Sequence, residues 1–260
     1  NIFAVRIGEV IFYPAENCAC WNFPTRGNTS PPAGNNPSPL EFAEKCLENG
    51  ANGITVHPRP DLRHIKPSDL ADIKKITQEY DVEFNIEGNP LEQENNHYPG
   101  FSKLIQNNKP DQVTLVPDDS NQLTSDHGWD LKATSTELKE LSESYKNQNI
   151  RTSIFLDPIK EQLQLAKEIN IDRVELYTGP FAKAFENQDA KTLEIYEEAI
   201  LFANEIDLKL NAGHDLNLSN LATLISYGNI EEVSIGHALI VECLDLGLEE
   251  TIKRYLKILK

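Results

Sequence analysis

The feature that most constrains the fold of this chain is the regular alternation of short apolar runs with helical segments from residue 39 onward. Runs rich in β-branched residues predict buried strands, and each is followed by a segment with helical spacing. The expected strands are residues 53–56, 82–87, 112–116, 152–156, 172–177, 208–211 and 232–235. Because strands and helices that alternate through short connections form parallel sheets with right-handed crossovers, the pattern predicts an α/β fold.

The beginning of the chain decides between a closed barrel and an open sheet. Residues 2–13 are apolar enough to supply an eighth strand, whereas residues 17–39 are rich in Pro, Gly, Asn and Ser and predict a loop. Eight strand–helix units close into a (β/α)8 barrel, for which 260 residues is a typical length. We therefore expect residues 1–260 to form a single (β/α)8 TIM barrel domain, with a doubly wound open sheet as the alternative.

Local signals place several helices between the strands. The expected helices include residues 40–49, 69–80, 159–169, 190–204 and 218–227, followed by two closing helical stretches. Thr134 and Glu137 form a capping-box pattern that predicts the start of another helix. Thr178-Gly179-Pro180 is interpreted as the end of a strand, with the next helix beginning at about residue 190.

Charge and cysteine content narrow the functional classes. The formal net charge is −17, which argues against nucleic-acid binding because phosphate neutralisation requires basic patches. The four cysteines form neither a disulfide framework nor a zinc pattern, so we expect reduced thiols in a cytoplasmic protein. No run is long enough to span a membrane, so no membrane partner is expected.

Titratable side chains follow the carboxyl ends of several expected strands. His57, Arg59 and His64 come after the strand at residues 53–56, and Glu87 closes the next strand. Later in the chain, His214 and His237 follow two further strands. In a parallel barrel all these strand ends lie on the face where active sites are built. Histidine exchanges protons near neutral pH and arginine binds phosphate, so the pattern indicates acid–base chemistry on an anionic molecule.

The last two strand–helix turns resemble phosphate-binding loops. Residues 211–215 and 235–238 each place a glycine between an expected strand and an expected helix. Glycine permits close approach of a ligand to the backbone, and a helix N-terminus presents N–H groups and a positive dipole. Because the loops after strands seven and eight are the usual phosphate site of such barrels, small phosphorylated substrates are expected.

With these residues placed, the sequence resembles the pyridoxine 5'-phosphate synthase family from about residue 34 to the C-terminus. The motifs that carry the resemblance, in the family's order, are residues 53–64, 84–89, 113–117, 175–178, 211–214 and 235–238. The resemblance implies a (β/α)8 barrel with extra helices, assembled as a homo-octamer of dimers. It also implies that 1-deoxy-D-xylulose 5-phosphate condenses with 3-amino-2-oxopropyl phosphate to give pyridoxine 5'-phosphate, phosphate and water, with no metal and no cofactor.

The same resemblance assigns roles to individual residues. It implies that His57 and Glu87 are proton acceptors, that His214 is the proton donor, and that Glu175 stabilises charge in the transition state. The residues implied to hold deoxyxylulose phosphate are Arg59, His64 and Thr124. The residues implied to bind the phosphate end of the other substrate are Asp215, through its backbone, Gly236 and His237.

The N-terminal segment departs from the family pattern. The family's first strand carries an Asn-x-Asp-His or Asn-x-Asn-Lys segment that contacts substrate, and residues 1–33 show no such segment. We expect this atypical segment to pack less regularly than the rest of the chain. Two alternatives stay open: a metal-dependent isomerase or hydrolase using His57, Glu87, His214 and His237 as ligands, and an inactive barrel that only binds a phosphorylated metabolite.

Overall fold

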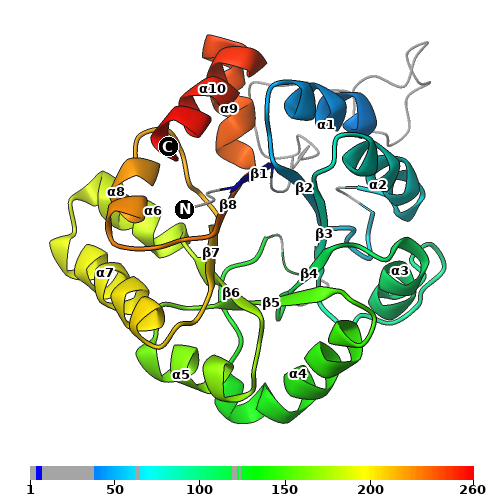
Figure 1. Cartoon of the computed structure of the whole chain (residues 1–260), viewed down its shortest axis with the longest axis horizontal. Coiled ribbons are helices and arrows are strands. Elements are labelled where there is room, and N and C mark those ends of the chain that lie inside the picture. Colours follow the sequence, from blue (N-terminus) through cyan, green and yellow to red (C-terminus); the bar gives the residue numbers. More distant parts are fainter. Residues whose placement is uncertain (1–3, 8–37, 63–64, 119–121, 123) are drawn as a thin grey trace.

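The eight strands of the protein form one closed, entirely parallel barrel (Figure 1). The computed structural model describes residues 4–7, 38–62, 65–118, 122 and 124–260. The strands are β1 (Ala4–Ile7), β2 (Gly53–Val56), β3 (Glu83–Gly88), β4 (Gln112–Leu115), β5 (Arg151–Leu156), β6 (Arg173–Tyr177), β7 (Leu210–Gly213) and β8 (Glu232–Ile235). The barrel predicted from the alternation of strands and helices is therefore confirmed, and the open-sheet alternative is wrong.

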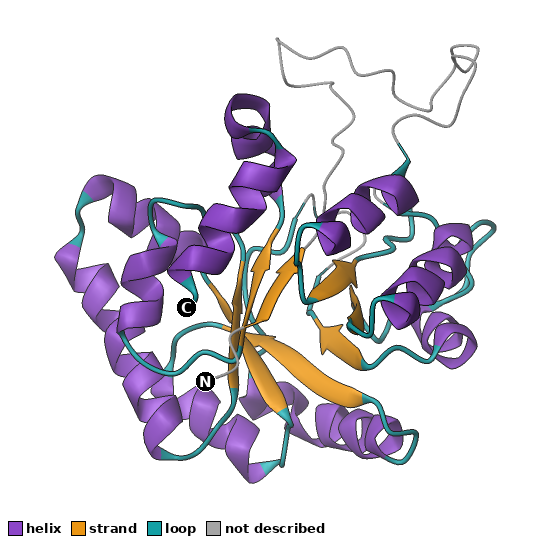
Figure 2. Ribbon diagram, turned by 45° about the horizontal axis from the view of Figure 1, so that its top comes forward, coloured by secondary structure: helices purple, strands orange, loops and turns teal. Residues whose placement is uncertain are grey.

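Helices surround the barrel on its outer side (Figure 2). They are α1 (Pro39–Glu48), α2 (Leu70–Glu79), preceded by the 3₁₀ turn η1 (Pro67–Asp69), α3 (Phe101–Asn108), α4 (Leu131–Lys146), α5 (Lys160–Glu168), α6 (Gly179–Asn187), α7 (Ala190–Glu205), α8 (Leu221–Ser226), α9 (His237–Leu246) and α10 (Leu248–Ile258). None of the described helices is both long and apolar enough to cross a membrane.

Two helix starts differ from the sequence-based expectation. Helix α4 begins at Leu131, where the Asp130 side chain accepts a hydrogen bond from the Lys132 N–H at 3.1 Å, so the predicted cap at Thr134 is wrong. The Thr134 hydroxyl instead donates to the Asp130 carbonyl at 2.9 Å, one turn inside the helix. Gly179 and Pro180, interpreted from the sequence as the end of a strand, instead begin helix α6, which has proline in its first turn. Proline is favoured there because its missing N–H would have had no partner within the helix.

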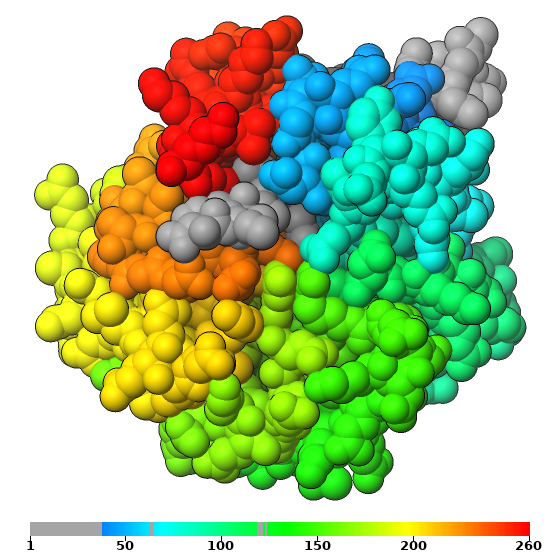
Figure 3. Space-filling view, viewed as in Figure 1, coloured from blue at the N-terminus to red at the C-terminus, as the bar shows by residue number. Residues whose placement is uncertain are grey.

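The barrel is closed by a strand from the N-terminal segment. Strand β1 pairs with β2 on one side and with β8 on the other, through registers such as Ile7 with Ile54 and Val5 with Val233. The expectation of an eighth strand near the start of the chain is therefore confirmed. The expected irregular packing of residues 1–33 falls, apart from residues 4–7, outside the described residues. Helix α10 lies beside α1, so the last and first described helices adjoin (Figure 3).

Residues alternate along the strands between the helix-facing side and the barrel interior. Ile54 and Phe84 belong to the same apolar core as the helix residue Leu70, so they face the helices. The intervening positions face the interior, where the Asn85 amide donates to the hydroxyls of Thr55 at 3.1 Å and Thr114 at 3.0 Å. The interior of this barrel is therefore polar at mid-height, and buried hydrogen bonds link three neighbouring strands.

Charged residues at the amino ends of the strands form a cluster that we call the floor cluster. It comprises Glu83, Gln112, Arg151, Arg173, Asn211 and Glu232. Arg151 makes two parallel contacts with Glu83, at 2.8 and 2.9 Å, and a third with Glu232 at 3.1 Å. Glu232 also accepts from Arg173 and from the Asn211 amide. These contacts join six strands, β3–β8, at the end of the barrel opposite the predicted site, where side-chain contacts serve stability.

Candidate active site

The carboxyl ends of the strands bring the predicted catalytic side chains to one mouth of the barrel. His57 follows the last residue of β2, and Glu87 is the fifth residue of β3. His214 follows β7 directly, and His237 is the first residue of α9, two positions after β8. Since all eight strands are parallel, these positions share one end of the barrel. His64, predicted to hold the sugar phosphate, lies outside the described residues.

His57 and Glu87 form a buried acid–base pair. Nδ1 of His57 lies 3.3 Å from Oε1 of Glu87, and the two residues are only 4% and 8% exposed. Strand β2 stops before the two prolines that follow His57, because proline lacks the N–H that a strand interior requires. Strand β3 continues to Gly88, so its inward-facing position 87 reaches the level of His57. A proton can pass between the imidazole and the carboxylate at this distance after a small adjustment.

Arg59 is held by an aspartate that the sequence analysis did not single out. Its Nη2 donates to Oδ2 of Asp118 at 2.8 Å, and both side chains are buried. The same oxygen accepts from the Ser125 hydroxyl at 2.8 Å, and the Asn89 amide donates to the Asp118 carbonyl at 2.8 Å. Asp118 follows β4 within the next loop, so its place after a strand end was the available signal. These contacts fix the orientation of the guanidinium within the mouth.

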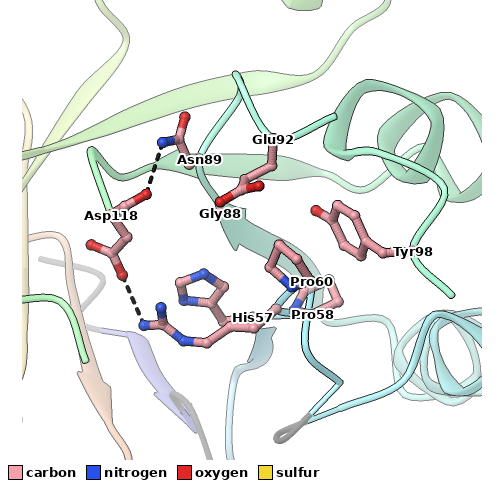
Figure 4. A pocket seen from close by; sticks show the side chains of 9 residues that line it. His57, Pro58, Pro60, Gly88, Asn89, Glu92, Tyr98 and Asp118 are labelled. Atoms are coloured by element: carbon pink, nitrogen blue, oxygen red, sulfur yellow. Dashed lines mark hydrogen bonds and ion pairs between the residues drawn. The ribbon is translucent and has the colours of Figure 1, made fainter. Parts of the chain in front are cut away.

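A pocket lies beside this arginine and the acid–base pair (Figure 4). It is open to solvent, comprises about 280 Å³ when the open space at its entrance is included, and is lined by His57, Pro58, Arg59, Pro60, Gly88, Asn89, Glu92, Tyr98 and Asp118. Asn89 and Glu92 lie across the pocket from His57 and Pro58. Among the described residues that line the pocket, Arg59 alone carries a permanent positive charge, so it is the group suited to bind a phosphate.

On the other side of the mouth, His214 lies among polar and aromatic partners. Its Nε2 is 2.9 Å from the Thr124 hydroxyl, and its Nδ1 is 3.1 Å from Oδ2 of Asp215. The edge-on ring of Tyr177 is centred 5.2 Å from the imidazole. Thr124, predicted to bind the sugar phosphate, is thus brought against the predicted proton donor.

The backbone at His214 and Asp215 is left-handed at two successive residues. Their φ angles are +90° and +57°, a region that costs an L-residue about 1–2 kcal/mol. The Thr178 hydroxyl lies 2.6 Å from both the Gly213 and His214 carbonyls, and the Thr178 N–H donates to the Gly213 carbonyl at 3.0 Å. The end of β6 therefore pins the turn that presents His214.

Glu175 lies inside the barrel against the end of β7. It is 2% exposed, and a Cβ added to Gly213 would overlap its carboxylate. Glycine is thus required at 213 by the close approach of an acid rather than by an unusual φ. The structure places the predicted charge-stabilising residue next to the turn that carries His214.

The two predicted phosphate loops differ. After β8, Gly236 caps α9, which begins at once with His237, so a helix N-terminus follows the strand as predicted. After β7, α8 does not begin until Leu221, so the same prediction is wrong there. The intervening loop is held by the Asn217 side chain, which accepts from the N–H groups of Ser219 and Asn220 at 2.9 and 3.0 Å. Polar side chains that bond nearby N–H groups favour such turns over helix.

The charges around His214 change the pKa values of two neighbouring side chains, Asp215 and Tyr177. Contact with His214 lowers the pKa of Asp215 against the opposing effect of burial, and the nearby His237 lowers it further. Burial raises the pKa of Tyr177, and the carboxylates of Asp215, Asp126 and Asp157 raise it further. Among the described residues, no three His, Cys, Asp or Glu side chains are grouped as ligands for a metal ion.

Comparison with known proteins places the chain in a family. Residues 31–260 match the model of the family described as pyridoxal phosphate biosynthesis protein PdxJ. The chain belongs to the PdxJ family. A protein of Christiangramia forsetii named pyridoxine 5'-phosphate synthase is 47% identical over 230 residues, covering 87% of this chain and 92% of that protein. One of the same name from Xanthomonas oryzae pv. oryzae is 45% identical over 229 residues, covering 87% and 90%.

Solved structures of other families share the PdxJ barrel architecture. A mutant tryptophan synthase α-subunit from the hyperthermophile Pyrococcus furiosus aligns with a TM-score of 0.55 at 16% identity, covering 99% of this chain and 97% of that one. Identity this low shows the fold alone. The family match begins at residue 31, close to residue 34, where the resemblance seen in the motifs began. This PdxJ chain is an enzyme of vitamin B6 biosynthesis.

Proposed function

We propose that this chain condenses 1-deoxy-D-xylulose 5-phosphate with 3-amino-2-oxopropyl phosphate to form pyridoxine 5'-phosphate, inorganic phosphate and water. The observation that carries the proposal is the buried His57–Glu87 pair beside Arg59, at the same mouth as His214, in a member of this family. The name that these relatives share, pyridoxine 5'-phosphate synthase, supports the product.

The reaction is a series of proton transfers, for which the site has several acids and bases. Arg59, with Thr124 and His64, holds the sugar phosphate while the amine of the second substrate attacks the ketone to form an imine. His57 and Glu87 remove protons from carbon and nitrogen. In the overall balance the sugar loses its phosphate and two waters leave, the first of them on imine formation. A new carbon–carbon bond to the ketone carbon of the aminoketone closes the ring, and His214 protonates the hydroxyl formed there, which leaves as the second water. Glu175 stabilises the cationic intermediates. Positioned groups of this kind contribute typically ~10²–10⁴-fold each.

The phosphate end of the aminoketone binds at the other side of the mouth. Gly236 and His237 lie at the start of α9, where backbone N–H groups and the helix dipole favour an anion. The backbone at Asp215 completes this subsite. Assembly as a homo-octamer of dimers belongs to the same proposal, and light scattering of the purified protein measures it.

The decisive experiment incubates the protein with both phosphates and detects pyridoxine 5'-phosphate by mass. Reactions that lack one substrate, and reactions of Glu87→Gln with both, are the controls. Product in the complete reaction alone supports the proposal. The absence of product, together with calorimetric binding of deoxyxylulose phosphate, would instead establish an inactive metabolite-binding barrel, the alternative that the divergent residues 1–33 favour.

A further inference from the structure

The turn that carries His214 stores strain that its neighbours maintain. Two successive non-glycine residues at positive φ are uncommon, and such strain persists only where the surrounding structure determines it. Here Thr178 holds the carbonyls on both sides of the turn. The conformation places the Asp215 carboxylate 3.1 Å from Nδ1 of the preceding histidine.

We propose that Asp215 is a positioning residue that orients the His214 ring and favours its protonated form, so that Nε2 can deliver a proton at the mouth. This inference rests on the proposed function, in which His214 is the proton donor. It assigns a role to the carboxylate of Asp215, whereas the family resemblance implies a role only for the backbone at that position.

The geometry at the two ring nitrogens supports the assignment. Nδ1 lies 3.1 Å from Oδ2 of Asp215, an ion-pair contact that lacks the angle of a hydrogen bond, and Nε2 lies 2.9 Å from the Thr124 hydroxyl. Tyr177 packs edge-on against the ring and limits its rotation. A histidine with one nitrogen in contact with a carboxylate and the other at the reaction site is placed for proton transfer.

Charges on several elements act on this histidine. The Asp215 carboxylate attracts the cationic form of His214, and the same attraction is seen in the pKa of Asp215, which contact with His214 lowers. His237, at the start of α9, acts on the same carboxylate of Asp215 and lowers its pKa further. Glu175 lies behind Gly213 and favours a cation, and Asp126 and Asp157 act on the adjacent Tyr177. Asp215 makes the direct contact, but its side chain is 51% exposed, so solvent screens the attraction in part.

The carboxylate also predicts a split between turnover and binding. A negative side chain beside a phosphate subsite repels the phosphate. If Asp215 served phosphate binding, its removal would raise KM, whereas a positioning role predicts the following changes. Removing the charge should leave the KM for the aminoketone phosphate unchanged or lower. It should reduce kcat where His214 is no longer protonated, at the alkaline side of the profile.

The test compares Asp215→Asn, Asp215→Glu and the control Asp126→Asn with the parent. Asparagine tolerates left-handed backbone, so Asp215→Asn should fold, and thermal unfolding checks this. Asp126 is a matched control because it contacts the ring of another histidine, His127, at 2.5 Å and lies in the same mouth. The readouts are the titration of the His214 ring by NMR, assigned with His214→Gln, and the pH profiles of kcat and KM.

In Asp215→Asn the His214 titration midpoint should fall by about half a pH unit or more, since an adjacent opposite charge is lost. The alkaline limb of kcat should fall with it, giving roughly 3-fold lower kcat at pH 8. Asp215→Glu should change the His214 midpoint and the alkaline kcat less than Asp215→Asn does. Asp126→Asn should change each of these two quantities by no more than a third of the change seen in Asp215→Asn. An unchanged midpoint, or an effect equalled by Asp126→Asn, overturns the proposal. If the parent makes no product, the proposed function fails, while the ring titration still decides the link between Asp215 and His214.

Discussion

The two ends of the barrel use charge in different ways. The floor cluster is built on Arg151 and Arg173, whose guanidinium groups stay charged at any physiological pH, with contacts such as 2.6 Å to Gln112 and 2.8 Å to Glu83. At the mouth the Arg59–Asp118 pair is joined by two contacts in which the base is histidine, at 3.3 Å for His57–Glu87 and 3.1 Å for His214–Asp215. Permanent charges with several partners stabilise a fold, whereas titratable groups in looser contact can exchange protons.

The largest expected effect is a loss of stability when a carboxylate of the floor cluster is removed. Glu232→Ala removes a buried carboxylate that contacts Arg151 and Arg173, so we expect the free energy of unfolding to fall by about 3–5 kcal/mol. Denaturant titration measures this. The control Glu231→Ala removes the neighbouring, more exposed carboxylate, which contacts Lys209 at 3.5 Å, and should cost about 1 kcal/mol or less. Equal losses in both variants would show that the floor cluster is not the stabilising element.

Next in size is the loss of the base at the mouth. Glu87→Gln keeps the shape of the side chain but removes its ability to accept a proton, so turnover should fall roughly 10²-fold or more. Affinity for deoxyxylulose phosphate should change little because Arg59 and its partners are untouched. His57→Asn, next to those groups, should weaken both. Single-turnover product formation and calorimetric binding measure the two quantities, and a Glu87→Gln variant that turns over like the parent refutes the role.

A smaller effect on kinetics is expected at Arg59, the permanently charged side chain of the mouth, when its partner Asp118 is changed. Asp118→Asn removes the charged partner of Arg59, so the KM for deoxyxylulose phosphate should rise about 10-fold with a smaller change in kcat. Ser125→Ala removes one hydrogen bond to the same carboxylate and should raise KM only about 3-fold. Steady-state kinetics on both variants give the comparison. A lower KM in Asp118→Asn would mean that the aspartate competes with the phosphate for Arg59 instead of orienting it.

The smallest effect is expected from a chelator. If side chains alone carry the acid–base chemistry, prior dialysis against EDTA should change the rate of product formation by less than about 2-fold. A large loss that added divalent metal ions restore would favour the metal-dependent alternative, in which the histidines of the mouth are ligands. A circular dichroism spectrum after dialysis that matches the spectrum before dialysis is the control that the protein has not unfolded.

Much of the fold could be predicted because local signals and tertiary structure agree. The strand expected at 152–156 ends in an apolar run, residues 154–156, just before Asp157 and Pro158, and it forms part of β5 (Arg151–Leu156). Helix α6 was missed because Gly179 and Pro180 end a strand and also begin a helix, and sequence alone does not separate the two uses. The start of α4 was misplaced because Asp130 and Thr134 both match cap preferences, and the hydrogen bond at Asp130 decides between them.

The candidate site was predictable to the level of strand ends but not of contacts. His57, Glu87 and His214 were placed at one mouth because parallel strands end together. Asp118 was missed because its partner, Arg59, is 59 positions away in the sequence. The left-handed backbone at His214 and Asp215 leaves no compositional trace, since neither residue is glycine, and only the contacts of Thr178 reveal how it is held.

The seam between β1 and β8 has a consequence for how the protein is made. It joins four residues near the start of the chain to a strand that is synthesised only after β7. Ring closure therefore has to wait until almost the whole polypeptide has left the ribosome, and contacts between such distant segments form slowly. Until then β1 and the latest finished strand both expose unpaired edges, which are templates for aggregation. A chain that ends before β8 therefore keeps two unpaired strand edges, even if all its helices form.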